Sequence, residues 1–205
     1  LPCLIVCIDA GGVSLESGII HNTTVVQESC TSIIFQFAVT SAHGDIVFLA
    51  DCLSSRETLE NLKRELARCG VPVLIAPGNH DFCWEGSPWL TESWPENVFV
   101  FTGELESVTI QGLDCRVYGA AFRSMDCPSL LEDFRAEGDE KYRVAVLHGD
   151  PMQRRSPYNP VTGAQVQNSA LDYLALGHVH KAGAFRAGET LCAWPGCPMG
   201  RGWVE

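Results

Sequence analysis

The chain has 205 residues, of which 46% are apolar, and this length and composition suit a single domain spanning residues 1–205. The formal net charge of -11 argues against a generally basic surface, so any contact with nucleic acid must be local or mediated by metal ions. The 10 cysteines form no C-x-x-C pair, and no secretory signal pattern is present, so we expect a cytoplasmic protein. The longest apolar stretches are too short to span a bilayer, so no membrane interaction is expected.

Short apolar runs bounded by polar or glycine residues predict buried strands. These runs lie at residues 4–8, 46–50, 71–76, 98–101, 144–147 and 173–176. Leucines at helical spacing predict a helix at residues 56–69, and further helices are predicted at residues 31–42 and 129–135. Residues 105–110 and 115–118 predict an antiparallel hairpin. The pattern predicts an α/β fold with mixed sheets and long loops at residues 87–95 and 151–160.

Polar side chains capable of binding metal follow five of the predicted strands. They are Asp9, Asp51, Asn79 with His80 and Asp81, His148 with Asp150, and His178 with His180. Ligand sites of open α/β sheets lie at the carboxyl ends of strands, so these residues are expected to converge on one edge. Carboxylate, amide and imidazole groups suit Mn, Fe or Zn, and a pair of such ions about 3.5–4 Å apart can hold a hydroxide in line with a phosphorus atom. The pattern predicts phosphoester hydrolysis.

Each motif taken alone also has a simpler explanation. Gly-Asn-His-Asp at residues 78–81 can form a turn, and Asp9 and Asp51 are more often helix or turn caps than ligands. The two imidazoles of residues 177–180 can be solvated side chains on one face of an extended segment. The joint placement of all the motifs at strand ends favours a metal site.

These motifs resemble those of the calcineurin-like metallophosphoesterases, in particular the bacterial SbcD-type DNA repair exonucleases. The resemblance runs from residue 71 to residue 202, through APGNHD, VLHGD, YLALGHVHKA and AWPGCPMGRG. It implies a layered sandwich of mixed β-sheets flanked by helices and a centre of two divalent metal ions, with Mn²⁺ expected before Fe or Zn.

The resemblance also implies a role for each motif residue. One metal site takes Asn79, His148 and His178, the other takes Asp9 and His180, and Asp51 bridges the two. His80 is the implied catalytic acid, because an imidazole beside the metal ions that is not a ligand can protonate the leaving oxygen. Asp81 and Asp150 are expected to orient imidazoles or turns.

Two positions depart from the family pattern. The family has Asp-x-His at the first strand, whereas Gly11 stands where the histidine belongs, so the Asp9 site is expected to be weak. Ala50 replaces the glycine that normally precedes the bridging aspartate. The family also continues beyond the segment at residues 200–202, so a chain truncated near Glu205, or a fold that closes differently, is expected.

The sequence therefore predicts a metal-dependent phosphoesterase, first of all a phosphodiesterase similar to a DNA exonuclease, with activity reduced by the loss of one ligand. Two alternatives stay open: a catalytically impaired binding or scaffold protein, and a phosphatase of small molecules or proteins. The expected partners are a phosphate-ester substrate such as DNA and, by resemblance alone, a coiled-coil ATPase. A nuclease is also expected to carry a basic strip, for which the candidates are Arg154, Arg155, Lys181 and Arg186.

Overall fold

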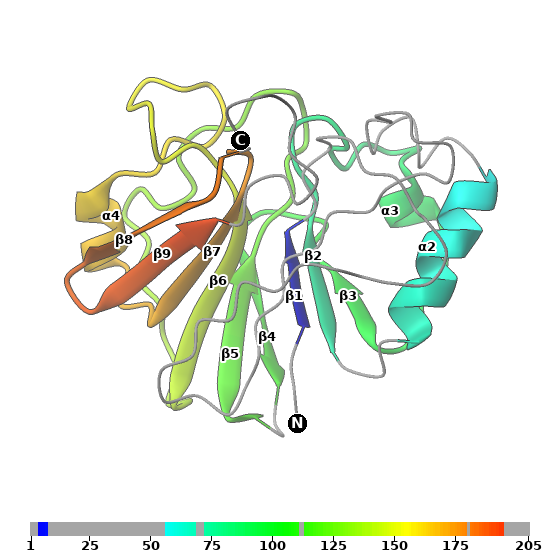
Figure 1. Cartoon of the computed structure of the whole chain (residues 1–205), viewed down its shortest axis with the longest axis horizontal. Helices are drawn as coiled ribbons and strands as arrows, with labels where there is room; N and C mark the ends of the chain where they lie inside the picture. Colours follow the sequence, from blue (N-terminus) through cyan, green and yellow to red (C-terminus); the bar gives the residue numbers. More distant parts are fainter. Residues whose placement is uncertain (1–3, 8–55, 69–71, 111–112, 180, 195–205) are drawn as a thin grey trace.

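The computed structural model describes residues 4–7, 56–68, 72–110, 113–179 and 181–194 (Figure 1). The predicted strand at residues 46–50 and the predicted helix at residues 31–42 lie outside these ranges. Within them, no helix combines the length and the apolar character that a membrane crossing requires.

The described strands form two sheets. The smaller is parallel, in the order β1 (Leu4–Cys7), β2 (Val73–Ala76), β3 (Val98–Val100). The larger has the order β4-β5-β6-β7-β9-β8 and is mixed, since its inner strands are parallel and its edge strands antiparallel. Its strands are β4 (Glu106–Ile110), β5 (Cys115–Gly119), β6 (Tyr142–His148), β7 (Tyr173–Gly177), β8 (Gly183–Ala187) and β9 (Thr190–Trp194). The predicted mixed α/β class is therefore confirmed.

Helices cover the outer faces of the two sheets. In Figure 1, α2 (Arg56–Arg68) and α3 (Pro88–Thr91) lie beside the smaller sheet and α4 (Gly163–Asn168) lies at the opposite flank. Leu59, Leu62 and Leu66 of α2 pack in one cluster with Val73 and Ile75 of β2, as the helical spacing of the leucines predicts.

Side chains along each strand point alternately to the two faces of the sheet, and this alternation determines how the other layers pack. Leu74 of β2 points away from α2 and packs with Val144 and Val146 of β6, so the two sheets meet face to face. Ala145 and Leu147 of β6 alternate with these valines, face the other way and pack in a cluster with Val166 of α4. The result is a helix, sheet, sheet, helix sandwich.

Several local predictions can be compared with these elements. The helix predicted at residues 56–69 is confirmed over its described part, Arg56–Arg68, and the hairpin is confirmed by the pairing of Ile110 with Cys115 beside its turn. The helix predicted at residues 129–135 is wrong, because the segment forms only a turn at residues 130–133. There the Leu130 N–H donates to the Asn159 side chain, and Asp133 has a left-handed backbone with φ of 58°, so contacts outside the segment override its helical pattern.

Four elements were not predicted from the sequence: the strands β8 and β9 and the helices α4 and α3. The β8–β9 hairpin was not predicted because β8 is an edge strand with the sequence GAFRA, in which none of the five residues is buried. Helix α4 has a capping box between Thr162 and Gln165, a signal present in the sequence. Helix α3 is a single turn inside the predicted loop at residues 87–95.

Candidate metal centre

Three parallel strands bring the central motifs to one edge of the sandwich. In the larger sheet, His148 at the end of β6 pairs with Gly177 at the end of β7, so His178 follows directly beside it. In the smaller sheet, β2 leads into the Gly78–Asp81 segment that carries Asn79. The motif residues therefore meet at the edge of the sandwich where the carboxyl ends of β2, β6 and β7 lie close together.

The side chains of these motifs are in contact. His148 Nε2 lies 2.7 Å from Asn79 Oδ1, and the ring centroids of His148 and His178 are 5.0 Å apart. Asn79 and His148 are only 2% and 1% exposed, whereas His178 is half-buried. The structure thus brings together the three residues that, together with Asp51, form one metal site in the family that the sequence resembles.

The ring of His148 is enclosed by its neighbours. A Cβ at Gly78 would lie 2.5 Å from Nδ1 of this ring, so only glycine leaves room for it. On another side, the buried Phe122 ring contacts His148 edge-on with centroids 5.1 Å apart. Phe122 is itself fixed beside the motif, because its N–H donates to the Pro77 carbonyl and its carbonyl accepts from Cys83. This packing leaves little freedom to the imidazole.

The backbone at His178 is strained. Its φ of 94° lies in a region that residues with a Cβ rarely adopt, and such strain is found at functional sites when the surroundings enforce it. The ring of Tyr158 lies beside the His178 ring, with a centroid distance of 5.1 Å. Packing against Tyr158 and His148 therefore holds His178 in a conformation that the chain alone would not favour.

The other motif residues take different positions. His80 is exposed, between the buried Asn79 and the buried Asp81. Asp81 accepts a hydrogen bond from the Gly78 N–H at 2.8 Å and closes the turn that presents Asn79. Asp150 accepts from the backbone N–H groups of the two residues after Pro151, at 2.8 and 3.1 Å, and so shapes the start of the following loop. Both carboxylates thus accept hydrogen bonds from backbone N–H groups of the adjacent turns.

Comparisons with known proteins identify the family of this chain. Residues 20–204 match the calcineurin-like phosphoesterase superfamily domain. The chain belongs to that superfamily. It is also 29% identical over 182 residues to the uncharacterized metallophosphoesterase YhaO of Bacillus subtilis, an alignment that covers 80% of this chain. The chain spans 43% of the length of that relative.

Membership in the calcineurin-like superfamily implies metal-dependent hydrolysis of phosphate esters with divalent ions. The described residues fit such ions: amide oxygen and imidazole nitrogen are suitable donors, and neighbouring ligands of an octahedral ion lie about 3 Å apart when each bond is about 2.1 Å. The separation of 2.7 Å between Asn79 Oδ1 and His148 Nε2 is close to that spacing.

The described residues hold only part of the predicted centre. Among them, no three His, Cys, Asp or Glu side chains gather closely enough to bind an ion by themselves. The predicted ligands Asp9, Asp51 and His180 lie outside the described ranges, as does Gly11. Their roles, and the roles assigned to the described motif residues, stay predictions.

Three buried cysteines of the described core have raised thiol pKa values. Burial raises the pKa of Cys83 to about 11, and the nearby Asp81 carboxylate acts in the same direction. Burial likewise raises the pKa of Cys127 to about 11 and that of Cys192 to about 12. These thiols stay protonated at neutral pH and act as small core residues, as the sequence predicted.

Three residues that contact the histidines or their backbone were not predicted from the sequence: Phe122, Tyr158 and Asn159. Phe122 follows β5, where no polar motif marks a site. Tyr158 and Asn159 lie in the loop that the sequence predicted at residues 151–160. Only the Asn-Pro pair at residues 159–160 was a local signal, and it indicates no more than a turn.

Proposed function

We propose that this domain is a metal-dependent phosphodiesterase, with the ends of DNA strands as its first candidate substrate. The observation that supports it is the contact between Asn79, His148 and His178 at the carboxyl ends of β2, β6 and β7. Oxygen and nitrogen donors presented at one rim are what a phosphoesterase of this superfamily requires.

Each described residue has a task in this proposal. Asn79, His148 and His178 would hold divalent ions, which supply Lewis acidity toward the phosphoryl oxygens and lower the pKa of water. His80 is exposed beside them and would protonate the leaving oxygen through its imidazole. The turn closed by Asp81 would keep Asn79 and His80 in place.

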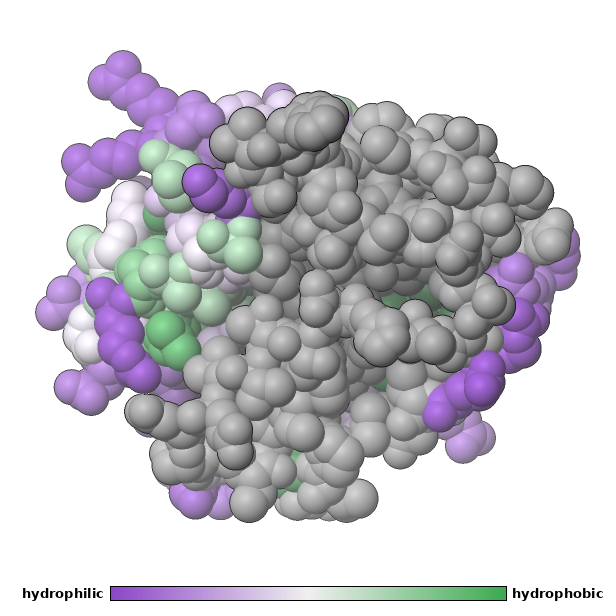
Figure 2. Space-filling view, in the orientation of Figure 1, coloured by the Kyte–Doolittle hydropathy of each residue, from purple (hydrophilic) through white to green (hydrophobic). Residues whose placement is uncertain are grey.

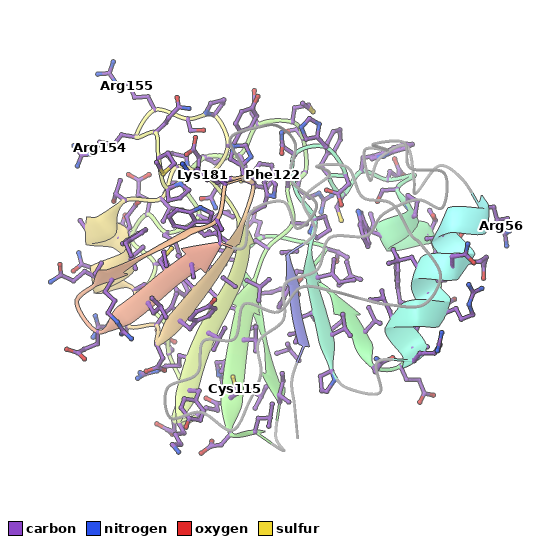
Figure 3. The ribbon with its side chains drawn as sticks, in the orientation of Figure 1. Arg56, Cys115, Phe122, Arg154, Arg155 and Lys181 are labelled. Carbon is purple, nitrogen blue, oxygen red and sulfur yellow. The ribbon has the colours of Figure 1, made fainter. Side chains whose placement is uncertain are left out.

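Basic side chains near the site favour a polyanionic substrate. Arg154 and Arg155 are exposed on the loop that follows β6, and they project outward at the upper left in Figure 3, where Figure 2 shows a hydrophilic surface. Lys181 is also exposed and follows the His178 segment. Arg186 differs, because Ala187 pairs with Thr190 at the far end of β8, so it lies away from the site edge. We therefore restrict the proposed basic strip to the other three residues.

The test uses purified protein loaded with Mn²⁺. We expect hydrolysis of bis(p-nitrophenyl) phosphate, abolished in His80→Ala without loss of bound metal, while His148→Ala loses the metal as well. His43→Ala, at a histidine outside the predicted motifs, serves as the matched control. Wild-type turnover in His80→Ala would remove His80 from the mechanism.

Metal content and substrate choice separate the candidate functions. Elemental analysis that finds two ions with turnover supports the enzyme, whereas one ion or none with no turnover supports the binding or scaffold role that Gly11 suggests. Preference for DNA ends over a simple monoester supports the nuclease, and the reverse preference supports a phosphatase. A coiled-coil ATPase partner belongs only to the nuclease form of this proposal.

A further inference from the structure

Asn159 is a fully buried polar residue beside the candidate metal centre. It is 0% exposed, and its φ of 47° is left-handed, a conformation that asparagine tolerates better than most residues with a Cβ. A buried amide must find hydrogen-bond partners, because an unsatisfied one destabilises the fold. The identity of those partners shows what the residue does.

The partners of Asn159 connect the end of β6 to the segment at residues 127–130. Its Nδ2 donates to the His148 carbonyl at 2.8 Å, and its Oδ1 accepts from the Leu130 N–H at 2.8 Å. Its backbone N–H donates to the Cys127 carbonyl at 2.7 Å, and its carbonyl accepts from Asp150 at 3.0 Å. Asn159 therefore forms hydrogen bonds with the backbone of both residues that flank Gly149, His148 and Asp150.

The need for glycine at position 149 is explained by its close contact with Asn159. A Cβ at this position would lie 2.7 Å from Asn159 Nδ2 and 2.8 Å from its carbonyl oxygen. Glycine thus lets Asn159 approach the backbone directly after His148. Tyr158, which precedes Asn159 in the chain, packs against the ring of His178. One dipeptide of the loop therefore contacts the structure around both histidines.

We propose that Asn159 is a positioning residue that fixes His148 for metal binding. The ring of His148 is already enclosed by its surroundings, so its direction depends on the backbone from which it projects. The bond from Asn159 fixes the carbonyl of that backbone. This inference rests on the proposed metal-dependent function, and it adds a residue outside the ligand motifs to the machinery of that site.

The experiment compares Mn²⁺ affinity, measured by isothermal titration calorimetry, with thermal stability. Asn159→Gly keeps the left-handed backbone and removes the amide, and Asn159→Asp keeps the acceptor for Leu130 while losing the donor to His148. Asn97→Gly is the matched control, since Asn97 Nδ2 donates to the Leu66 carbonyl at 2.9 Å, at the end of α2. Residues that orient metal ligands typically contribute about 10–100-fold to affinity.

We expect both Asn159 variants to bind Mn²⁺ about 10–100-fold more weakly, with turnover largely restored by excess Mn²⁺. The Asn97 variant should lose thermal stability and keep its affinity. Wild-type affinity in Asn159→Gly, even with a lower melting temperature, would overturn the proposal and leave Asn159 a structural residue. Absence of Mn²⁺ binding by the wild-type protein would instead refute the proposed function.

A measurement on the wild-type protein covers the case in which neither variant folds. The Leu130 N–H donates to Asn159 Oδ1, so metal binding should slow its hydrogen exchange if Asn159 couples this amide to His148. Equal exchange with and without Mn²⁺ would overturn the proposal.

Discussion

Gly78→Ala adds one methyl group directly against the ring of His148. The new Cβ would lie 2.5 Å from Nδ1, 2.6 Å from Cε1 and 2.8 Å from Cγ of that ring. Ordinary carbon contacts begin near 3.5 Å, so the ring and the turn must separate by about 1 Å. The φ of Gly78 is not in the left-handed region, so backbone conformation adds nothing to this effect.

The ring cannot move without losing other contacts. Retreat from Gly78 changes the distance of 2.7 Å from Nε2 to Asn79 and the packing against Phe122. Overpacking of this kind destabilises by about 1–3 kcal/mol, and a misplacement of about 1 Å at a catalytic group can lower the rate about 100-fold. We therefore expect a modest loss of stability and a large loss of Mn²⁺-dependent turnover.

Kinetics with bis(p-nitrophenyl) phosphate, Mn²⁺ titration and thermal denaturation together measure these effects. Gly163→Ala is the matched control, because a Cβ at this first residue of α4 meets nothing within 4 Å. The control should keep wild-type turnover and affinity. If Gly78→Ala also keeps both, the close approach to His148 does not constrain the site and the reasoning is refuted.

Two further predictions concern the support of the larger sheet. The Tyr118 hydroxyl accepts a hydrogen bond from the Glu137 N–H at 2.7 Å and donates one to the Glu137 carbonyl. Tyr118→Phe should therefore lower the free energy of unfolding, measured by denaturant titration, by about 1–3 kcal/mol without changing Mn²⁺ affinity. An unchanged free energy of unfolding would contradict this prediction. Hydrogen bonds from Arg116 lower the pKa of Glu140 to about 2, whereas the pKa of an unfolded glutamate is about 4.3. The ionised Glu140 therefore stabilises the folded state fully above about pH 4.3, and this contribution is lost as the pH falls toward 2. Glu140→Gln should reduce the change of melting temperature across that window, whereas Glu132→Gln, at an exposed carboxylate, is the control; an unaltered pH profile in Glu140→Gln would refute the assignment.

The parts of the fold that the sequence predicted are those in which local pattern and burial agree. Helix α2 presents its leucines to β2, and the buried strands β2, β6 and β7 have the continuous apolar runs of strands covered on both faces. The pattern at residues 129–135 failed because its backbone bonds with a distant asparagine. The edge strand β8 lacked an apolar run, so only its pairing with β9 defines it.

The candidate site was predictable to the extent that its residues are chemically distinctive. Asn79, His148 and His178 were named because their motifs all follow predicted strands and resemble those of a known family, and the structure brings the three side chains into contact. Phe122 and Asn159 could not be named, because their importance comes from tertiary position alone. A phenylalanine after a strand and an asparagine before a proline are ordinary in sequence.

The predicted ligands of the candidate centre come from both sheets, so the packing between the sheets controls the distance between them. The contact between Asn79 and His148 spans 69 residues of sequence and joins the end of β2 to the end of β6. Their separation depends on how the sheets pack, through Leu74 against Val144 and Val146. Because protein interiors are close-packed, a shift at this interface must be transmitted to the pair of donors at its end. We therefore expect the core between the sheets to influence the metal affinity of the proposed centre, although its apolar side chains are not among the predicted ligands.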